Sequence, residues 1–156
     1  MRAVVLREAS RSKRKLVGYS DVRAAKIAHI RRDPWVEWLF FDPNEGVQIR
    51  AAGRARIHSQ DAVCEKAWAK SPMAHKQLYA SATAPGTPIP KGDSSQTRFG
   101  GRIKCGESEI AQAYLNFAVV VTTIEHLDWL FVSQTDNRRA AFVWNRNRFQ
   151  GLWLAP

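Results

Sequence analysis

Two long strand-like stretches organise the middle of this sequence. Residues 35–42 and 47–58 are rich in aromatic and β-branched side chains, and the segment between them, 42–46, carries Asp, Pro, Asn and Gly, which form turns. In the second stretch Val47 and Ile49 alternate with Gln48 and Arg50. Because side chains alternate between the two faces of a strand, this pattern predicts that Gln48 and Arg50 share one face.

Further strand-like runs precede and follow this pair, and helical patterns are inserted between them. The runs cover residues 2–7, 15–19, 116–123, 127–133, 138–144 and 151–154, and turn-forming residues separate them. Helices are expected from Ser20 or Asp21 to about 32, from 59–61 to about 70, and from 71–72 to about 79. The count predicts a mainly β fold, a β-barrel with helical additions and mostly antiparallel neighbours.

Length and composition favour one compact domain over residues 1–156. The 156 residues are 45% hydrophobic, which is enough to build a core. Residues 80–109 are rich in Pro, Gly, Ser and Thr and are expected to form a long functional or mobile loop. No apolar run approaches the roughly 20 residues of a membrane-spanning helix. Nor does the N-terminal sequence resemble a signal peptide, so we expect a cytoplasmic protein without membrane attachment.

The charge balance indicates an anionic partner. Lys and Arg number 24 against 14 Asp and Glu, a net charge of +10. Nucleic acid, an acidic membrane surface and a phosphorylated small molecule are all compatible with this excess. Nucleotide-binding glycine motifs, metalloprotease motifs and nucleophile elbows are absent from the sequence, and the four histidines lack metal-ligand spacing, so no metal site is expected.

An anion site is predicted where the second strand passes into the first helix. Tyr19 and Ser20 place hydroxyl groups there, and Arg23 and Lys26 follow three residues apart. A helix N-terminus presents unpaired backbone N–H groups, so a phosphate could accept hydrogen bonds from these groups and from both cations.

Several segments, in this order and spacing, resemble the pyridoxamine 5'-phosphate oxidase family over nearly the whole chain outside the long loop. They are Arg2-Ala-Val-Val-Leu-Arg7, Tyr19-Ser20-Asp21-x-Arg23-x-x-Lys26, Asp33-Pro34, Val47-Gln48-Ile49-Arg50-x-x-Gly53-Arg54-Ala55, Leu127-Asp128-Trp129-Leu130, Arg138-Arg139-Ala140-x-Phe142 and Trp153-Leu154-Ala155-Pro156. The resemblance implies an FMN-binding split β-barrel of antiparallel Greek-key type. It also implies a homodimer with FMN at the subunit interface.

The resemblance carries particular roles onto this sequence. It implies that Arg2 reaches the flavin phosphate, that Gln48 hydrogen-bonds the flavin ring, and that Trp129 and Arg139 come from the other subunit. The remaining implied cofactor contacts are Val4, Val5, Leu6, Tyr19, Ser20, Arg23 and Lys26. The flavin would perform the chemistry by accepting a hydride, so no side chain is expected to act as a catalytic nucleophile.

The substrate region departs from the family pattern. Arg7 stands where the family has a phosphate-binding lysine, and the tyrosine and arginine expected on the later helix are missing from residues 66–76. Lys70 and His75 could hold a different small anionic substrate. Family members also begin with additional structure upstream of the segment that matches Arg2 to Arg7.

Three functions follow from these observations. The leading hypothesis is an FMN-dependent oxidoreductase with an unidentified substrate. The first alternative is a non-catalytic flavin- or haem-binding protein of the same fold. The second is a basic barrel that binds nucleic acid through its six tryptophans. It is less favoured, because four of these tryptophans fall within predicted strands, where aromatic residues usually pack into a core.

Overall fold

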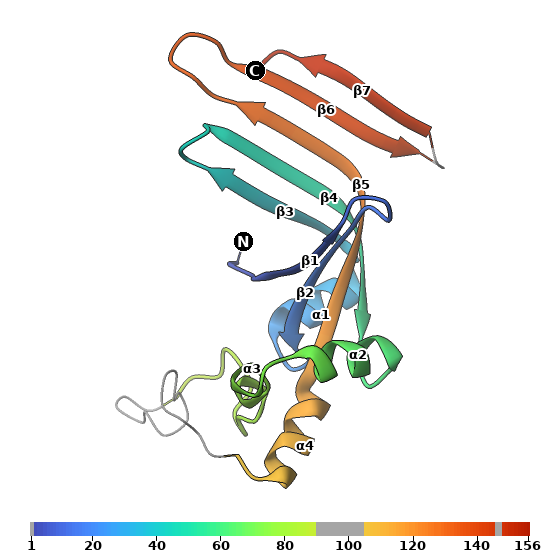
Figure 1. The fold of residues 1–156 in the computed structure, drawn as a ribbon, viewed down its shortest axis with the longest axis vertical. Helices are drawn as coiled ribbons and strands as arrows, with labels where there is room; N and C mark the ends of the chain where they lie inside the picture. Colours follow the sequence, from blue (N-terminus) through green and yellow to red (C-terminus); the bar gives the residue numbers. More distant parts are fainter. Residues whose placement is uncertain (1, 90–104, 146–147) are drawn as a thin grey trace. The chain divides into compact units, whose positions relative to one another are not determined.

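The computed structural model describes residues 2–89, 105–145 and 148–156. Its elements are, in chain order, β1 (Leu6–Ser10), β2 (Lys15–Asp21), α1 (Ala25–Arg32), β3 (Trp35–Asp42), β4 (Val47–His58), α2 (Ala62–Lys70), α3 (Met73–Lys76), the short 3₁₀ helix η1 (Gln77–Tyr79), α4 (Glu107–Asn116), β5 (Phe117–Phe131), β6 (Arg138–Asn145) and β7 (Arg148–Leu154) (Figure 1). The described residues thus form mainly strands, which confirms the predicted fold class.

The strands form one 7-stranded sheet, and β5 is its central member. The order is β1-β2-β5-β4-β3, and β6 pairs with β5 and β7 with β6. The β3–β4, β5–β6 and β6–β7 pairs are antiparallel. Residues 43–46 join β3 to β4 by a short turn, as antiparallel pairing allows.

The β3–β4 hairpin has the predicted bounds, and two glycines of this region meet the backbone of β5 and its end. Gly46, with φ of +63°, closes the turn, and its carbonyl accepts a hydrogen bond of 2.8 Å from the Val132 amide. Gly53 lies against the backbone of β5, where an added Cβ would overlap the carbonyl oxygen of Thr123. Only glycine therefore permits this close approach.

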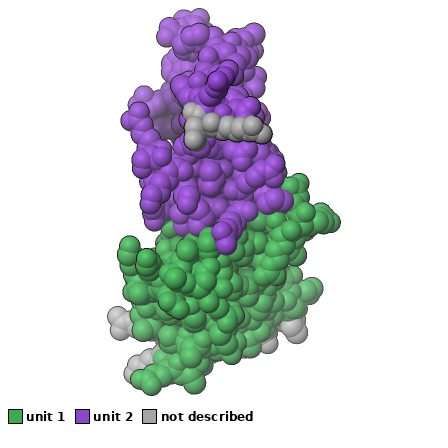
Figure 2. Space-filling view, turned by 90° about the vertical axis from the view of Figure 1, so that its right-hand side faces the viewer, with its two compact units in different colours: residues 1–7, 18–33, 57–120 green, residues 8–17, 34–56, 121–156 purple. Residues whose placement is uncertain are grey.

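The chain divides into two compact units, shown in different colours in Figure 2. Unit 1 comprises residues 1–7, 18–33 and 57–120, and unit 2 comprises residues 8–17, 34–56 and 121–156. The long strands β2, β4 and β5 contribute residues to both units.

Each unit has its own small core. In unit 1 the fully buried side chains of Ile27, Cys64, Phe117 and Val119 form it. In unit 2 the core consists mainly of alanines of β4 and β6, together with Ile124 and the fully buried Thr122. The Trp38 indole N–H donates a 3.0 Å hydrogen bond to the Thr122 hydroxyl, so this buried polar group is satisfied.

Several predicted boundaries were wrong. The first helix, α1, begins at Ala25 rather than after a cap at Ser20 or Asp21, because these two residues still belong to β2. The first strand begins at Leu6 rather than residue 2, and β7 begins at Arg148 rather than residue 151. The runs 116–123 and 127–133 are one continuous strand, β5. Residues 107–109, placed in the long loop, open α4, which the sequence analysis missed. Of that loop, residues 90–104 lie outside the described residues.

Among the described residues, none of the helices has the length and apolar character needed to cross a membrane.

Candidate functional site

Lys26 lies in the first turn of α1 in a position suited to an anion. It is half-buried, and burial lowers the pKa of its ammonium group, which the nearby charge of Arg2 lowers further. In the part of the chain that the structure describes, no carboxylate forms an ion pair with Lys26. The helix begins after Ala24 without a side-chain cap. Lys26, Arg2 and the uncapped N-terminus of α1 therefore lie near one another in unit 1, an arrangement that suits an anion.

Arg23 is placed differently from the prediction. It precedes α1 instead of lying on its first turn, and all its guanidinium nitrogens donate to protein acceptors. Nε and Nη2 donate to the Asp21 carboxylate at 3.0 and 2.7 Å, and Nη1 and Nη2 donate to the carbonyls of Ala82 and Ser81 at 3.1 and 2.9 Å. The hydrogen bond to Asp21 raises the pKa of Arg23. Arg23 thus anchors the segment that follows η1, and four of its five N–H groups already donate to the protein, which leaves one Nη1–H for any other acceptor.

Tyr19 and Ser20, the predicted aromatic and hydroxyl contacts, lie at the end of β2, just before α1. The Arg7 guanidinium lies over the Tyr19 ring at 5.3 Å from its centroid, and the same ring packs edge-on against Phe117 at 5.0 Å. Ser20 is buried, and its hydroxyl donates to the Asp21 carbonyl. By contrast, Val4, Val5 and Leu6 are exposed, at 42, 62 and 38%.

Tyr79 is a candidate site residue that sequence reasoning missed. Burial raises the pKa of its phenol to about 12, while the nearby Arg7 charge lowers it and Asp21 and Tyr19 raise it. Its ring packs edge-on against Phe117 at 5.1 Å. Tyr79 lies three residues beyond the segment 66–76, in which the family pattern places a tyrosine, and the sequence signal for it was an aromatic residue at the end of the third predicted helix.

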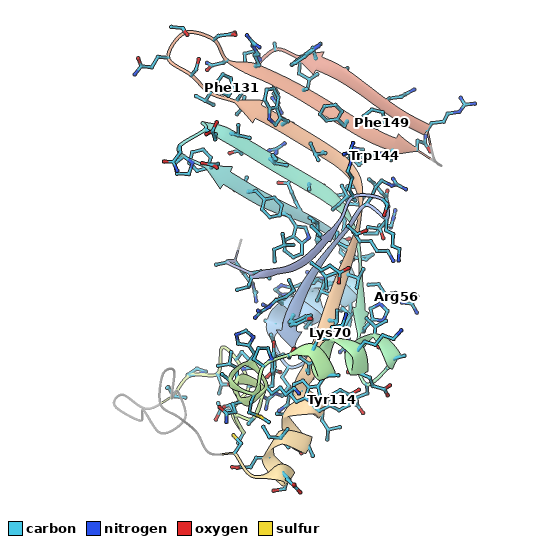
Figure 3. The ribbon with its side chains drawn as sticks, viewed as in Figure 1. Arg56, Lys70, Tyr114, Phe131, Trp144 and Phe149 are labelled. Atoms are coloured by element: carbon cyan, nitrogen blue, oxygen red, sulfur yellow. The ribbon has the colours of Figure 1, made fainter. Side chains whose placement is uncertain are left out.

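Lys70 and His75, the other predicted substrate-binding residues, do not form one cluster with Arg7. Lys70 is exposed at the C-terminal end of α2, and His75 is half-buried in α3 (Figure 3). Among the described residues, no hydrogen bond, ion pair or ring contact joins either side chain to Arg7. Their predicted role in substrate binding stays a prediction.

In unit 2 a chain of charged groups crosses four strands. Arg139 of β6 donates to the Asp128 carboxylate of β5, with Nη2 at 2.7 Å and Nε at 3.2 Å from its oxygens. The Arg50 guanidinium of β4 lies 3.6 Å from Asp128 and 4.0 Å from Glu37 of β3. The hydrogen bond from Arg139 is the main reason why the pKa of Asp128 is lowered. Gln48 is half-buried two residues before Arg50 and therefore shares its face of β4.

Trp129 and Arg139 lie on opposite faces of the sheet. The register pairs Trp129 with Ala140 and Leu130 with Arg139. Since directly paired residues of antiparallel strands point to the same face, Arg139 shares a face with Asp128, and Trp129 faces the other way. Arg138, paired with Phe131, is the arginine on the face of Trp129. A shift of one position, which the sequence could not fix, separates these two assignments.

Comparison with known proteins places these residues in a family context. Residues 1–59 match the family described as pyridoxamine 5'-phosphate oxidase, FMN-binding domain. The resemblance to the pyridoxamine 5'-phosphate oxidase family is confirmed. The segment that matches this oxidase family contains every predicted cofactor residue except Trp129 and Arg139. Among curated proteins, no match was found.

Solved structures confirm the fold over nearly the whole chain. A pyridoxamine 5'-phosphate oxidase-related, FMN binding protein from Nostoc punctiforme PCC 73102 is 21% identical with a TM-score of 0.78, and the alignment covers 99% of this chain and 80% of that chain. PhzG from Burkholderia lata 383, in complex with tetrahydrophenazine-1-carboxylic acid, is 14% identical with a TM-score of 0.75, covering 99% and 74%. This chain therefore has the split-barrel fold of the oxidase family.

Proposed function

We propose that this protein binds FMN and acts as an FMN-dependent oxidoreductase on a small anionic substrate. The family match over residues 1–59 supports FMN as the cofactor. The observation that carries the proposal is Lys26, a half-buried cation without an acidic partner among the described residues, beside a second cation, Arg2.

The residues of unit 1 fit a phosphate monoester. A half-buried ammonium group without a counter-ion is costly, and a doubly charged phosphate near Lys26 and Arg2 would offset that cost. The backbone N–H groups at the start of α1, which no side chain caps, are further hydrogen-bond donors for a phosphate. Arg23, which the sequence analysis included among the phosphate ligands, is left out of this proposal because four of its five N–H groups already donate to Asp21, Ser81 and Ala82.

Gln48 fits the edge of a flavin ring. Its amide can both donate and accept, as the carbonyl and N–H groups of the ring require. Within the described residues its side chain has no hydrogen-bond partner of its own. When bound, FMN supplies the chemistry of hydride acceptance. The chain's part is to hold the cofactor and to orient the substrate.

Arg7 and Tyr79 are the proposed substrate contacts in unit 1. Both lie close to Tyr19, and the phenol of Tyr79 stays protonated at neutral pH because its pKa is raised to about 12. A guanidinium group and a neutral phenol can both donate hydrogen bonds to a carboxylate or phosphate. The predicted contacts Lys70 and His75 remain a second option for the same anionic substrate.

A homodimer is part of the proposal, and the face of β5, β6 and β7 that carries Trp129 supports it. Paired positions place two clusters of aromatic rings there. Trp129 lies 6.4 Å from Trp153 and 6.3 Å from Phe131, and Phe149 lies 5.7 Å from Phe142 and 5.2 Å from Trp144. Phe131, Phe149 and Trp144 are labelled in Figure 3. Trp153 is 73% exposed and Phe149 58% exposed. A second copy would remove this apolar surface from water.

A titration with FMN tests the proposed cofactor site. Lys26→Ala should weaken FMN binding by on the order of 1.5–3 kcal/mol, because it removes a charge-assisted contact to the phosphate. Riboflavin, which lacks the phosphate, should bind equally to both proteins. The control is Lys66→Ala, which removes an exposed lysine of α2 in the same unit. An unchanged FMN affinity of the Lys26 variant would remove this residue from the site.

Turnover tests the oxidoreductase part separately. If the FMN-loaded protein is an oxidase, anaerobic addition of pyridoxamine 5'-phosphate or a related anionic amine should bleach the flavin absorption band, and oxygen should restore it. A protein that binds FMN but is not bleached by any such donor would be a non-catalytic flavoprotein of the same fold.

A further inference from the structure

The helices α2 and α4 of unit 1 border a groove that the proposed function does not use. It has a volume of about 440 Å³ and is lined by Glu65, Trp68, Ala69, Glu107, Ile110, Ala111 and Tyr114. The spacing of these residues, i, i+3 and i+4 on α2 and i, i+3, i+4 and i+7 on α4, shows that each helix contributes one continuous stripe. The small side chains of Ala69 and Ala111 leave space between the two stripes, in the size range of small-molecule sites.

The apolar part of the groove is aromatic. The Trp68 and Tyr114 rings pack edge-on at 5.6 Å between centroids, and Ile110 adds an aliphatic side chain. Trp68 already interacts with one cation, since the Lys76 ammonium lies 5.4 Å from the centre of its ring. The electron-rich face of an indole attracts ammonium groups in general, so this groove suits an apolar group that carries a positive charge.

The surface of the groove is almost entirely apolar, and the charged groups that border it are negative in a strongly basic protein. Glu65 and Glu107 are its charged lining residues, and the described lining includes no basic side chain. This contrasts with the net charge of +10 of the whole chain. Charge complementarity therefore favours a cationic occupant, whereas the substrate proposed above is an anion.

Tyr114 adds a polar atom that lacks a partner. Its hydroxyl oxygen is buried and forms no hydrogen bond with the part of the chain that the structure describes. Buried polar atoms without a partner are rare in proteins, and because this oxygen has almost no exposed surface, a ligand in the groove would satisfy it only after a movement of the Tyr114 side chain. Burial and the nearby groups Glu65, Cys64 and Asp61 raise the pKa of its phenol. A neutral phenol oxygen can accept a hydrogen bond from an N–H donor.

We infer that the α2–α4 groove is a binding site for a small organic ammonium ion that carries an apolar ring. The ring would lie against Trp68 and Ile110, and the ammonium group would face Glu65 and Glu107. This site does not depend on the proposed FMN chemistry, so it can hold or fail independently of that proposal.

Calorimetric titration of the full-length protein tests the inference, with phenethylammonium chloride as the probe. The matched ligands are phenethyl alcohol, which has the same ring but no charge, and phenylacetate, which has the opposite charge. We expect the ammonium ion to bind at least fivefold more tightly than the alcohol, and phenylacetate not to bind. Equal binding of the ammonium ion and the alcohol, or no heat of binding up to about 10 mM ammonium ion, would overturn the inference.

Substitutions in the α2–α4 groove test whether the ammonium ion binds there. Glu65→Gln and Glu107→Gln should each lower the affinity for the ammonium ion about threefold, as expected for partly solvated charge pairs. The control Glu45→Gln removes one negative charge from the exposed β3–β4 turn and should leave the affinity unchanged. Ala111→Phe should abolish binding by filling the groove, with retained folding checked by circular dichroism. Binding that is insensitive to all three groove variants would place the probe elsewhere and overturn the assignment.

Discussion

Asp128 shows how a single carboxylate organises this protein at the scale of residues. It accepts hydrogen bonds from Arg139 and lies 3.6 Å from Arg50, so it holds guanidinium groups of two different strands on one face. Its pKa is lowered in the folded protein. A carboxyl group with a lowered pKa stabilises the fold above its unfolded pKa, and this contribution is lost as the pH falls through the folded value.

Asp128→Asn should therefore destabilise the protein in a pH-dependent way. At pH 7 we expect a loss of about 1–2 kcal/mol in the free energy of unfolding, because the carboxylate that accepts from Arg139 through both oxygens is replaced by a neutral amide with one acceptor oxygen. The difference between variant and parent should shrink as the pH approaches 3. Urea unfolding at pH 7, 5 and 3 measures this, with Glu8→Gln, an exposed acid of β1, as the control. A difference that is constant over this range would show that the carboxylate charge is not what matters.

The sequence indicated candidate site residues but not the partners of their side chains, and the roles of these residues at the site stay predictions. Lys26 and Arg2 were singled out from the sequence, and the structure brings their charges together. Arg23 was also singled out, but the sequence could not show that Asp21, two residues away, binds it. The faces of Trp129 and Arg139 depend on the register of β5 with β6, which is set by pairing across a turn and not by either strand alone.

At the scale of elements, the close approach of β4 to its neighbour β5 leaves no space for a side chain at Gly53. The backbone of β5 leaves no space for a Cβ at position 53, because the Thr123 carbonyl oxygen occupies that space. Gly53→Ala should destabilise the protein by about 1–3 kcal/mol, since backbone atoms must move to relieve the overlap. Thermal unfolding measures this effect. Gly106→Ala is the control, because a Cβ there meets only the Glu109 carboxylate at 3.9 Å, and a similar loss in both variants would contradict this explanation.

Elements with strong local signals were predicted well, and those that depend on tertiary pairing were not. The β3–β4 hairpin combines apolar strands with a turn-forming segment, and its bounds were predicted correctly. Helix α4 begins after Gly106, and its cap is formed by the Glu109 side chain, a weak signal at the end of a Pro- and Gly-rich region. The polar residues Glu125 and His126 suggested a break in β5, but pairing with β6 begins at His126 and continues the strand.

At the scale of the whole molecule, the exposed aromatic face of β5, β6 and β7 is the feature that argues most directly for an assembly. The described cores consist largely of small side chains, while large ones such as Trp153 and Phe149 remain in contact with water. Isolated exposed apolar side chains are common on protein surfaces, but contiguous aromatic patches mark interfaces.

If the proposed homodimer forms through this face, Trp153→Glu should shift the protein from dimer to monomer. Truncating a central aromatic residue of an interface commonly costs 2 kcal/mol or more, and a buried carboxylate costs further, so the dimer dissociation constant should rise by at least about 30-fold. Sedimentation velocity over a range of protein concentrations measures this. Met73→Glu, a change at a 55% exposed residue of α3, should leave the dissociation constant unchanged. If the parent protein sediments as a monomer at all concentrations, or the Trp153 variant sediments as a stable dimer, this aromatic face is not the interface. If the dimer is also required for FMN binding, the Trp153 variant should lose FMN in proportion to its monomer fraction.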